Sequence, residues 1–277
     1  MAEPASKSRI IIIGGSGSAS GVNCKRIENE TGYKSINLGL FYGLRSEFTF
    51  NNIRMYIKNG DIVVMIPEYG SLDLNDYNAY EKKWGLAYDY SNIVNYNNPA
   101  ELIRDVHELL QSKTVILYTR LVNLNIKNMF VNGYYFYDVY FDNSGDMNKV
   151  KSKIFRPYDK IDGYNRTLPA LISNRGIEVL KRNNRLITSK GAKLVLFFPA
   201  FPRHEYLNNK IKIDDLYHIL RTKTNVTVLG TPGDFAYDYE LFADTTFHLT
   251  NKGAEHRTKM IIDKLIEANL ITDQRRI

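Results

Sequence analysis

Ser16, Asp244 and His248 are the residues whose types and spacing could do chemistry. Ser16 lies in a glycine-rich turn, residues 14–18 (Gly-Gly-Ser-Gly-Ser), directly after four consecutive isoleucines. Asp244 and His248 lie near the other end of the chain, with three residues between them. A serine hydroxyl is a weak nucleophile at neutral pH and needs a base beside it, and a histidine base needs an acceptor that orients its ring. The three residues therefore supply the parts of a Ser-His-Asp catalytic triad.

The elements that must position these residues follow from the apolar pattern. The isoleucines at 10–13 predict a strand buried on both faces. Further strands are expected over 34–38, 61–66, 192–198 and 226–229, and helices over 20–30, 46–58, 99–112, 168–189, 214–222 and 251–269. This alternation predicts an α/β protein, a three-layer α/β/α sandwich with a mainly parallel, flavodoxin-like sheet. Ligands of such sheets bind outside the carboxyl ends of the strands, where the Ser16 turn would lie.

The length of the chain, 277 residues, is compatible with one large domain. Tyrosine is unusually frequent, with 20 residues, and is dense in the stretch from Gly133 onward. We therefore expect a single domain over residues 1–277 with an aromatic insertion or cap around 121–165. The lone Cys24 excludes an internal disulfide, and we expect it to be a buried bystander.

Composition excludes several classes of function. The net charge is +7, but the basic residues are scattered, which argues against nucleic-acid binding. Clustered Cys and His spacing is absent, so no metal or organic cofactor is expected. No apolar run approaches the roughly 20 residues that cross a bilayer, and the first residues lack a signal-peptide core. The expectation is a cytoplasmic protein, or an extracytoplasmic domain that has lost its targeting segment.

Other residues are candidates for transition-state and substrate contacts. The backbone amides of Ser16 and Gly39 are candidate oxyanion donors, because a glycine lets a substrate approach the backbone closely. Gly39 could equally be a turn glycine. Glu68 and Tyr69 follow the third strand, and Arg120 follows an apolar stretch. Each of the three is either a substrate contact or an ordinary residue of the rim.

These segments resemble the SGNH (GDSL-like) hydrolases. The matching blocks are Gly14-Gly15-Ser16, Asn37-Leu38-Gly39, and Asp244 with His248. The chain is most similar to a bacterial branch with a Gly-Gly-Ser-x-Ser first block and Pro-Glu-Tyr after the third strand. It departs from the family pattern in having Gly15 in place of Asp, no Gly-x-Asn-Asp third block, and Asp-x-x-x-His in place of Asp-x-x-His. The resemblance implies enzymes or modules that modify cell-surface polysaccharides, often by moving acetyl groups.

The sequence therefore predicts a serine esterase or O-acyltransferase that acts on acyl esters, acetyl esters above all, of a carbohydrate. Ser16 would form a covalent acyl-enzyme, and His248 would accept and return the proton. The partner would be an acylated carbohydrate or another small ester. Water as the acceptor makes an esterase and a sugar hydroxyl makes a transferase, and the sequence leaves this choice open.

Two other interpretations stay open. A non-catalytic carbohydrate-binding module on the same fold would explain the many tyrosines and the missing third block. A nucleotide-binding site is the second, because Gly15-x-Gly17-x-x-x-Gly21 follows a strand and opens a helix. Its spacing is one residue longer than the usual fingerprint, and the second strand ends without the carboxylate that holds a ribose.

Overall fold

The computed structural model of the chain describes residues 8–40, 42, 45–74, 141–147, 157–161 and 163–272. The chain divides into two units, and all described residues belong to the one formed by Met1–Asn75 and Phe141–Ile277. Arg120 and the helix expected over 99–112 lie outside the described residues. Most of the aromatic insertion expected around 121–165 lies outside them as well.

A five-stranded parallel sheet forms the centre of the described unit. Its strands are β1 (Arg9–Gly14), β2 (Lys34–Asn37), β3 (Ile62–Ile66), β4 (Lys193–Leu196) and β6 (Thr227–Val228), in the order β2-β1-β3-β4-β6. The four isoleucines of β1 are at most 4% exposed, which confirms the strand predicted to be buried on both faces. Because β1 lies between β2 and β3, its carboxyl end has a neighbouring strand on each side.

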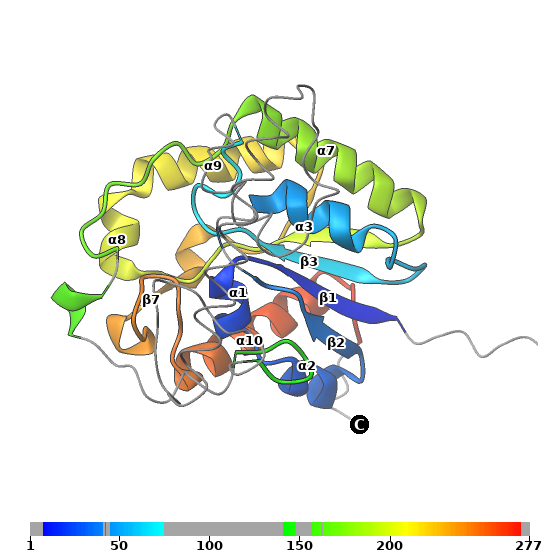
Figure 1. Cartoon of the computed structure of the whole chain (residues 1–277), viewed down its shortest axis with the longest axis horizontal. Helices are drawn as coiled ribbons and strands as arrows, with labels where there is room; N and C mark the ends of the chain where they lie inside the picture. Colours follow the sequence, from blue (N-terminus) through cyan, green and yellow to red (C-terminus); the bar gives the residue numbers. More distant parts are fainter. Residues whose placement is uncertain are drawn as a thin grey trace, which may run out of the picture. The chain divides into compact units, whose positions relative to one another are not determined.

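Helices cover both faces of this sheet (Figure 1). One layer contains α1 (Ser16–Gly21), α2 (Cys24–Thr31) and α10 (Asn251–Glu267), and the other contains α3 (Arg45–Ile53), α7 (Asn174–Ser189) and α9 (Lys210–Lys223). The strand order shows that the chain moves in one direction from β1 to β2 and in the other direction from β2 through β3 and β4 to β6, as is typical of sheets with helices on both faces. The predicted three-layer α/β fold is confirmed. A two-stranded sheet of β5 (Phe201–Pro202) and β7 (Ala236–Tyr237), with α8 (Arg203–Asn208) beside β5, completes the larger elements.

Several predicted helices differ from the observed ones: the helix expected over 46–58 ends at Ile53, and the helix expected over 214–222 already begins at Lys210. The helix expected over 20–30 is two helices, α1 and α2, because Asn23 starts the second one by accepting a hydrogen bond from the Arg26 amide at 3.0 Å. Gly32 ends α2 in the left-handed conformation (φ 70°). The helix expected from residue 168 begins only at Asn174, where the Ser173 side chain accepts from the Gly176 amide at 3.1 Å.

A buried carboxylate, Asp146, ties a distant segment to the edge of the sheet. It accepts from the Cys24 amide at 2.6 Å and from Asn37 Nδ2 at 2.9 Å, and it is fully buried. The Met147 amide donates to the Ala19 carbonyl at 2.9 Å. Residues 141–147 therefore hold the ends of β2 and α1 together, directly behind the serine turn.

Cys24 is expected to be unreactive while the protein is folded. Its side chain is fully buried, and burial together with the neighbouring Asp146 raises the pKa of the thiol. Because the thiolate is the reactive form, a thiol reagent such as DTNB should label no cysteine in the native protein and one in denaturant. The absorbance of released thionitrobenzoate measures the number of labelled cysteines under both conditions. Rapid labelling of native protein would contradict the burial of this thiol.

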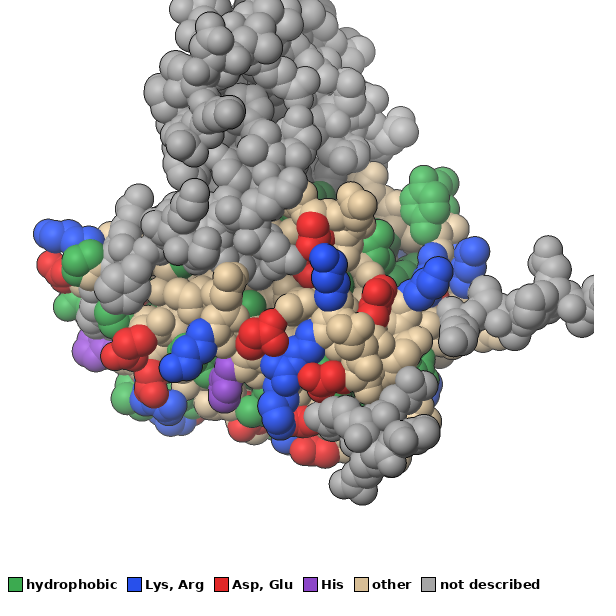
Figure 2. Space-filling model, turned by 90° about the horizontal axis from the view of Figure 1, so that it is seen from below, with side chains coloured by type: hydrophobic (Ala, Val, Ile, Leu, Met, Phe, Trp, Pro, Cys, Tyr) green, Lys and Arg blue, Asp and Glu red, His purple; other side chains and the backbone are tan. Residues whose placement is uncertain are grey.

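The described surface carries mixed charge. Figure 2 shows Lys and Arg side chains lying among Asp and Glu side chains on one face, with no extended basic patch on the coloured part of that face. Among the described residues, no helix is both long and apolar enough to cross a membrane.

Candidate active site

The serine turn places one hydroxyl at the carboxyl edge of the sheet. β1 ends at Gly14, Gly15 is extended, and α1 begins at Ser16. Gly15 and residues 17–21 are buried, whereas Ser16 is partly exposed. As the first residue of the helix, Ser16 has an amide with no carbonyl partner within α1. Both its hydroxyl and its amide are therefore placed where a substrate carbonyl could be attacked and stabilised.

The loop before α10 brings a histidine to this hydroxyl. His248 Nε2 lies 2.9 Å from Ser16 Oγ, and His248 Nδ1 lies 3.0 Å from Asp244 Oδ1. The loop is closed by two contacts, from the His248 amide to Thr245 Oγ1 at 3.0 Å and from the Ala243 amide to the His248 carbonyl at 2.9 Å. The structure thus brings together the three predicted catalytic residues.

The spacing of Asp244 and His248 suits their contact. Both side chains are largely buried, at 17% and 9% exposed. A carboxylate can only accept, so Asp244 places the imidazole proton on Nδ1 and leaves the Nε2 lone pair facing the serine hydroxyl. This is the tautomer in which His248 can take the proton of Ser16.

Glu68 lies at the other side of the serine hydroxyl. Its Oε1 atom accepts from the Gly17 amide at 2.7 Å and lies 3.3 Å from Ser16 Oγ. The side chain is buried, and burial raises the pKa of the carboxyl group, opposed by the Gly17 amide and by the charges of His248 and Arg257. The carboxyl group therefore holds the start of α1, and a substrate contact of Glu68 stays a prediction.

Tyr69 is a core residue. It is 4% exposed, and its ring packs edge-on against Phe201 at 5.1 Å and lies 6.3 Å from the ring of Phe247. Burial raises the pKa of its hydroxyl, which has no hydrogen-bond partner in the described part of the chain. The ring is therefore almost fully enclosed by the core, and the substrate contact of Tyr69 stays a prediction. Arg120 lies outside the described residues.

The Gly39 amide has a partner within the fold. It donates to Asn37 Oδ1 at 3.0 Å, while Asn37 Nδ2 donates to the Ser18 carbonyl at 3.0 Å. A Cβ atom at Gly39 would lie 2.7 Å from the Ala19 amide nitrogen, so the glycine is needed for close packing against α1. The oxyanion role of Gly39 requires its amide to leave Asn37, and that role stays a prediction.

Sequence reasoning missed Arg257. Its side chain is fully buried and donates to the Gly17 carbonyl at 3.1 Å and to the Phe198 carbonyl at 3.2 Å. Burial lowers the pKa of the guanidinium to about 10, which leaves it charged at neutral pH. The sequence did contain a signal that this arginine is buried. Arg257 lies three residues after Ala254 and four before Ile261, a spacing that places it on the apolar face of α10.

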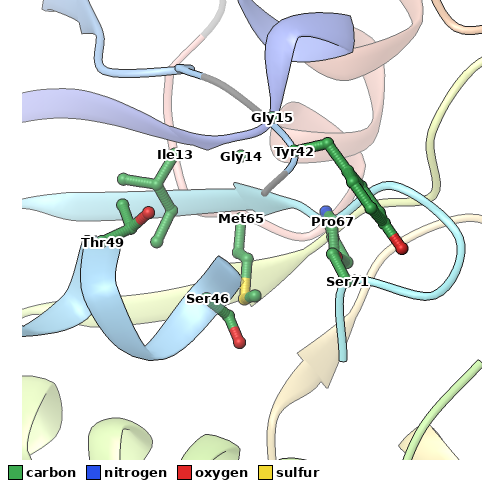
Figure 3. Close-up of a pocket in the computed structure, with 9 residues that line it drawn as sticks. All are labelled: Ile13, Gly14, Gly15, Tyr42, Ser46, Thr49, Met65, Pro67 and Ser71. Atoms are coloured by element: carbon green, nitrogen blue, oxygen red, sulfur yellow. The ribbon is translucent and has the colours of Figure 1, made fainter. Parts of the chain in front are cut away.

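A cavity of about 20 Å³ adjoins the serine turn on the α3 side of the sheet (Figure 3). Gly14, Gly15 and Tyr42 line it together with Ser46 and Ser71, whose buried hydroxyls have no hydrogen-bond partner among the described residues. This volume holds about one water molecule, which could satisfy both hydroxyls. The cavity is therefore suited to a water molecule and is too small for a sugar.

The described residues contain no group of three or more His, Cys, Asp and Glu side chains that could hold a metal ion.

Comparisons with known proteins add little to this geometry. No family model and no curated protein matches the chain. Among solved structures, the chain is similar to the protein YxiM from Bacillus subtilis, with 12% sequence identity and a TM-score of 0.43. The match covers 96% of this chain and 58% of YxiM, so this chain spans less than two thirds of that protein.

Proposed function

We propose that the protein is a serine esterase or O-acyltransferase of the SGNH type, acting on acyl esters, acetyl esters above all, of a carbohydrate. One observation carries the proposal, the hydrogen-bonded chain from Ser16 Oγ through the His248 ring to Asp244, with contacts of 2.9 and 3.0 Å. Catalytic groups held at these distances match the geometry of an activated serine.

The reaction would proceed in two halves. Ser16 Oγ attacks the ester carbonyl while His248 Nε2 takes its proton, and the Ser16 amide donates to the oxyanion. Collapse of the intermediate expels the alcohol, which takes the proton from His248 and leaves an acyl group on Ser16. Water or a sugar hydroxyl then attacks this ester, with His248 as base again, and regenerates the serine.

A groove supports the carbohydrate part of the proposal. It has a volume of about 480 Å³ and is lined by aromatic and charged side chains, among them Arg203, Asp238 and Tyr239. None of Ser16, Asp244 and His248 lines the groove. The chain connects it to the site through Phe201, a buried ring next to the lining residue Pro202 that stacks on Phe247 with ring centroids 5.3 Å apart. Aromatic rings beside charged hydrogen-bonding groups suit the apolar faces and hydroxyls of sugars.

The nucleotide interpretation is disfavoured by the glycines that suggested it. A Cβ atom at Gly15 or Gly17 would lie 2.4 or 3.1 Å from Glu68 Oε1, and one at Gly21 would lie 2.5 Å from Arg257 Nη1. These three positions therefore accommodate side chains of this protein. In addition, a buried carboxyl group already occupies the Gly17 amide, which a phosphate at the start of α1 would need.

Labelling with a fluorophosphonate probe and peptide mapping tests the proposal. Ser16 is expected to carry the adduct, Ser16→Ala to lose it, and Ser18→Ala to keep it. Ser18 is the matched control because it lies two residues away, is buried, and donates its hydroxyl to the Ile66 carbonyl, with no contact to the triad among the described residues. An unlabelled but folded wild-type protein would contradict serine catalysis and favour the carbohydrate-binding module.

An acetylated oligosaccharide with and without an acceptor sugar then separates the two activities. An esterase releases acetate at the same rate in both cases. A transferase yields acetylated acceptor at the expense of acetate.

A further inference from the structure

Glu68 is the buried group at the site that the triad does not use. It is 5% exposed and follows the last residue of β3 by two positions. A carboxyl group in the interior costs free energy unless its contacts compensate, so its retention beside the nucleophile calls for a physical explanation.

Its first contact fixes the backbone next to the nucleophile. Glu68 Oε1 accepts from the Gly17 amide at 2.7 Å, and Arg257 Nη1 donates to the Gly17 carbonyl at 3.1 Å. The amide and the carbonyl group of Gly17, the residue after Ser16, are thus both hydrogen-bonded to buried side chains. Rotation of this turn would break one of the two contacts, so the direction of the serine side chain depends on them.

Its second contact is with the nucleophile itself. Ser16 Oγ lies 3.3 Å from Glu68 Oε1 and 2.9 Å from His248 Nε2. A hydroxyl has one proton, so it can donate fully to only one of these acceptors. The shorter distance favours donation to His248, so the Glu68 oxygen then lies beside the hydroxyl without accepting from it.

The charged groups around Glu68 come from two further elements. His248 faces it from the loop before α10, and Arg257 faces it from α10 itself. Tyr69 and Tyr237 place their hydroxyls near Arg257. An ionised Glu68 stabilises positive charge on both His248 and Arg257, so its charge bears directly on the protonation of the base.

We propose that Glu68 is a positioning residue for the nucleophile: it holds the Gly17 amide, which fixes the backbone next to Ser16, and in its ionised form it stabilises positive charge on His248. This inference rests on the proposed serine chemistry. It assigns to Glu68 an effect on both the rate and the pH dependence of Ser16 reactivity.

The test measures the rate of fluorophosphonate labelling against pH for the wild type, Glu68→Gln and Glu68→Leu. Gln keeps an acceptor for the Gly17 amide but removes the charge. At pH values above the midpoint of the pH profile, we therefore expect a labelling rate within about threefold of wild type. The midpoint should move to lower pH by roughly half a unit to one unit. Glu68→Leu removes both the acceptor and the charge, and we expect its labelling rate to fall by about tenfold or more.

Glu205 supplies the matched control. It is another fully buried glutamate, and its Oε1 atom accepts from the Asn165 amide at 2.6 Å. Glu205→Gln and Glu205→Leu make the same chemical changes in a buried site outside the triad. They are expected to change the denaturation midpoint while leaving the labelling midpoint and rate of the folded protein unchanged.

Stability separates positioning from a merely structural role. Because burial raises the pKa of Glu68, folding stability falls as pH rises from the unfolded-state pKa towards this raised value, and the loss persists above it. Glu68→Gln is therefore expected to be at least as stable as wild type above neutral pH, while its labelling profile shifts. A stable variant with a shifted profile supports the inference even where Glu68→Leu does not fold.

The outcomes are distinguishable. If the wild type labels and Glu68→Gln shows an unchanged midpoint, the inference on Glu68 is overturned and serine catalysis stands. If the Glu205 variants shift the midpoint equally, the inference is also overturned, because the effect is general to buried glutamates. If the folded wild type does not label, the proposed function fails and this inference fails with it.

Discussion

His248→Ala is expected to lower kcat/KM for hydrolysis of an unactivated acetyl ester by about 10³- to 10⁴-fold. Nε2 lies 2.9 Å from Ser16 Oγ and is the acceptor for its proton, so without the ring the hydroxyl must attack while still protonated. The remaining turnover would come from the Ser16 amide and substrate binding. Initial rates of acetate release, with KM determined separately, measure the effect.

Asp244→Asn refines this prediction. The amide keeps the size of the side chain but can donate to Nδ1, which favours the tautomer with the proton on Nε2 and blocks acceptance from Ser16. We expect a loss in kcat of about 10²- to 10⁴-fold with little change in KM.

His256→Ala is the control for both triad substitutions. His256 lies within α10 and contacts the Tyr237 ring at 5.0 Å, without a contact to the triad among the described residues. Its substitution should leave kcat/KM within about threefold of wild type. Equal losses in His256→Ala and His248→Ala would indicate that general damage to the fold, and not loss of the base, lowers the rate.

Arg257→Met is expected to cause the largest loss of stability, about 3 kcal/mol in the free energy of unfolding. The guanidinium donates to the Gly17 and Phe198 carbonyls, which join α1 and the end of β4 to α10. Methionine fills much of the space but leaves both buried carbonyls without these donors. It also removes the positive charge that faces Glu68. Urea denaturation at neutral pH, followed by circular dichroism, measures the change.

Two further variants test the origin of this loss. Arg257→Lys keeps a charge but lacks the planar fork that reaches two carbonyls, so it should recover only part of the stability. Arg221→Met is the exposed control, because Arg221 lies over the Tyr217 ring at 5.5 Å and should contribute about 0.5 kcal/mol or less. Arg257→Met with the urea midpoint of wild type would show that the two carbonyl contacts are not stabilising.

The sequence by itself determined the class of fold and identified Ser16, Asp244 and His248, the three side chains that the structure joins by hydrogen bonds. The isoleucines at 10–13 could only be accommodated between two other strands, and the alternation of elements required crossovers and a parallel sheet. Parallel strands place all their carboxyl ends at one edge, so a serine after β1 and a histidine in the loop before α10 were predicted to meet. These features depend on local pattern and chain direction, which a single sequence contains.

Tertiary structure alone decided the surroundings of the nucleophile. Glu68 and Tyr69 are adjacent in sequence, yet one binds the start of α1 and the other packs against Phe201, because the chain turns between them. Arg257 becomes a buried donor only because the carbonyls of Gly17 and Phe198, which are far from it in sequence, lie within reach. The free energy of a buried charge depends on its partners in space, and local pattern does not specify those partners.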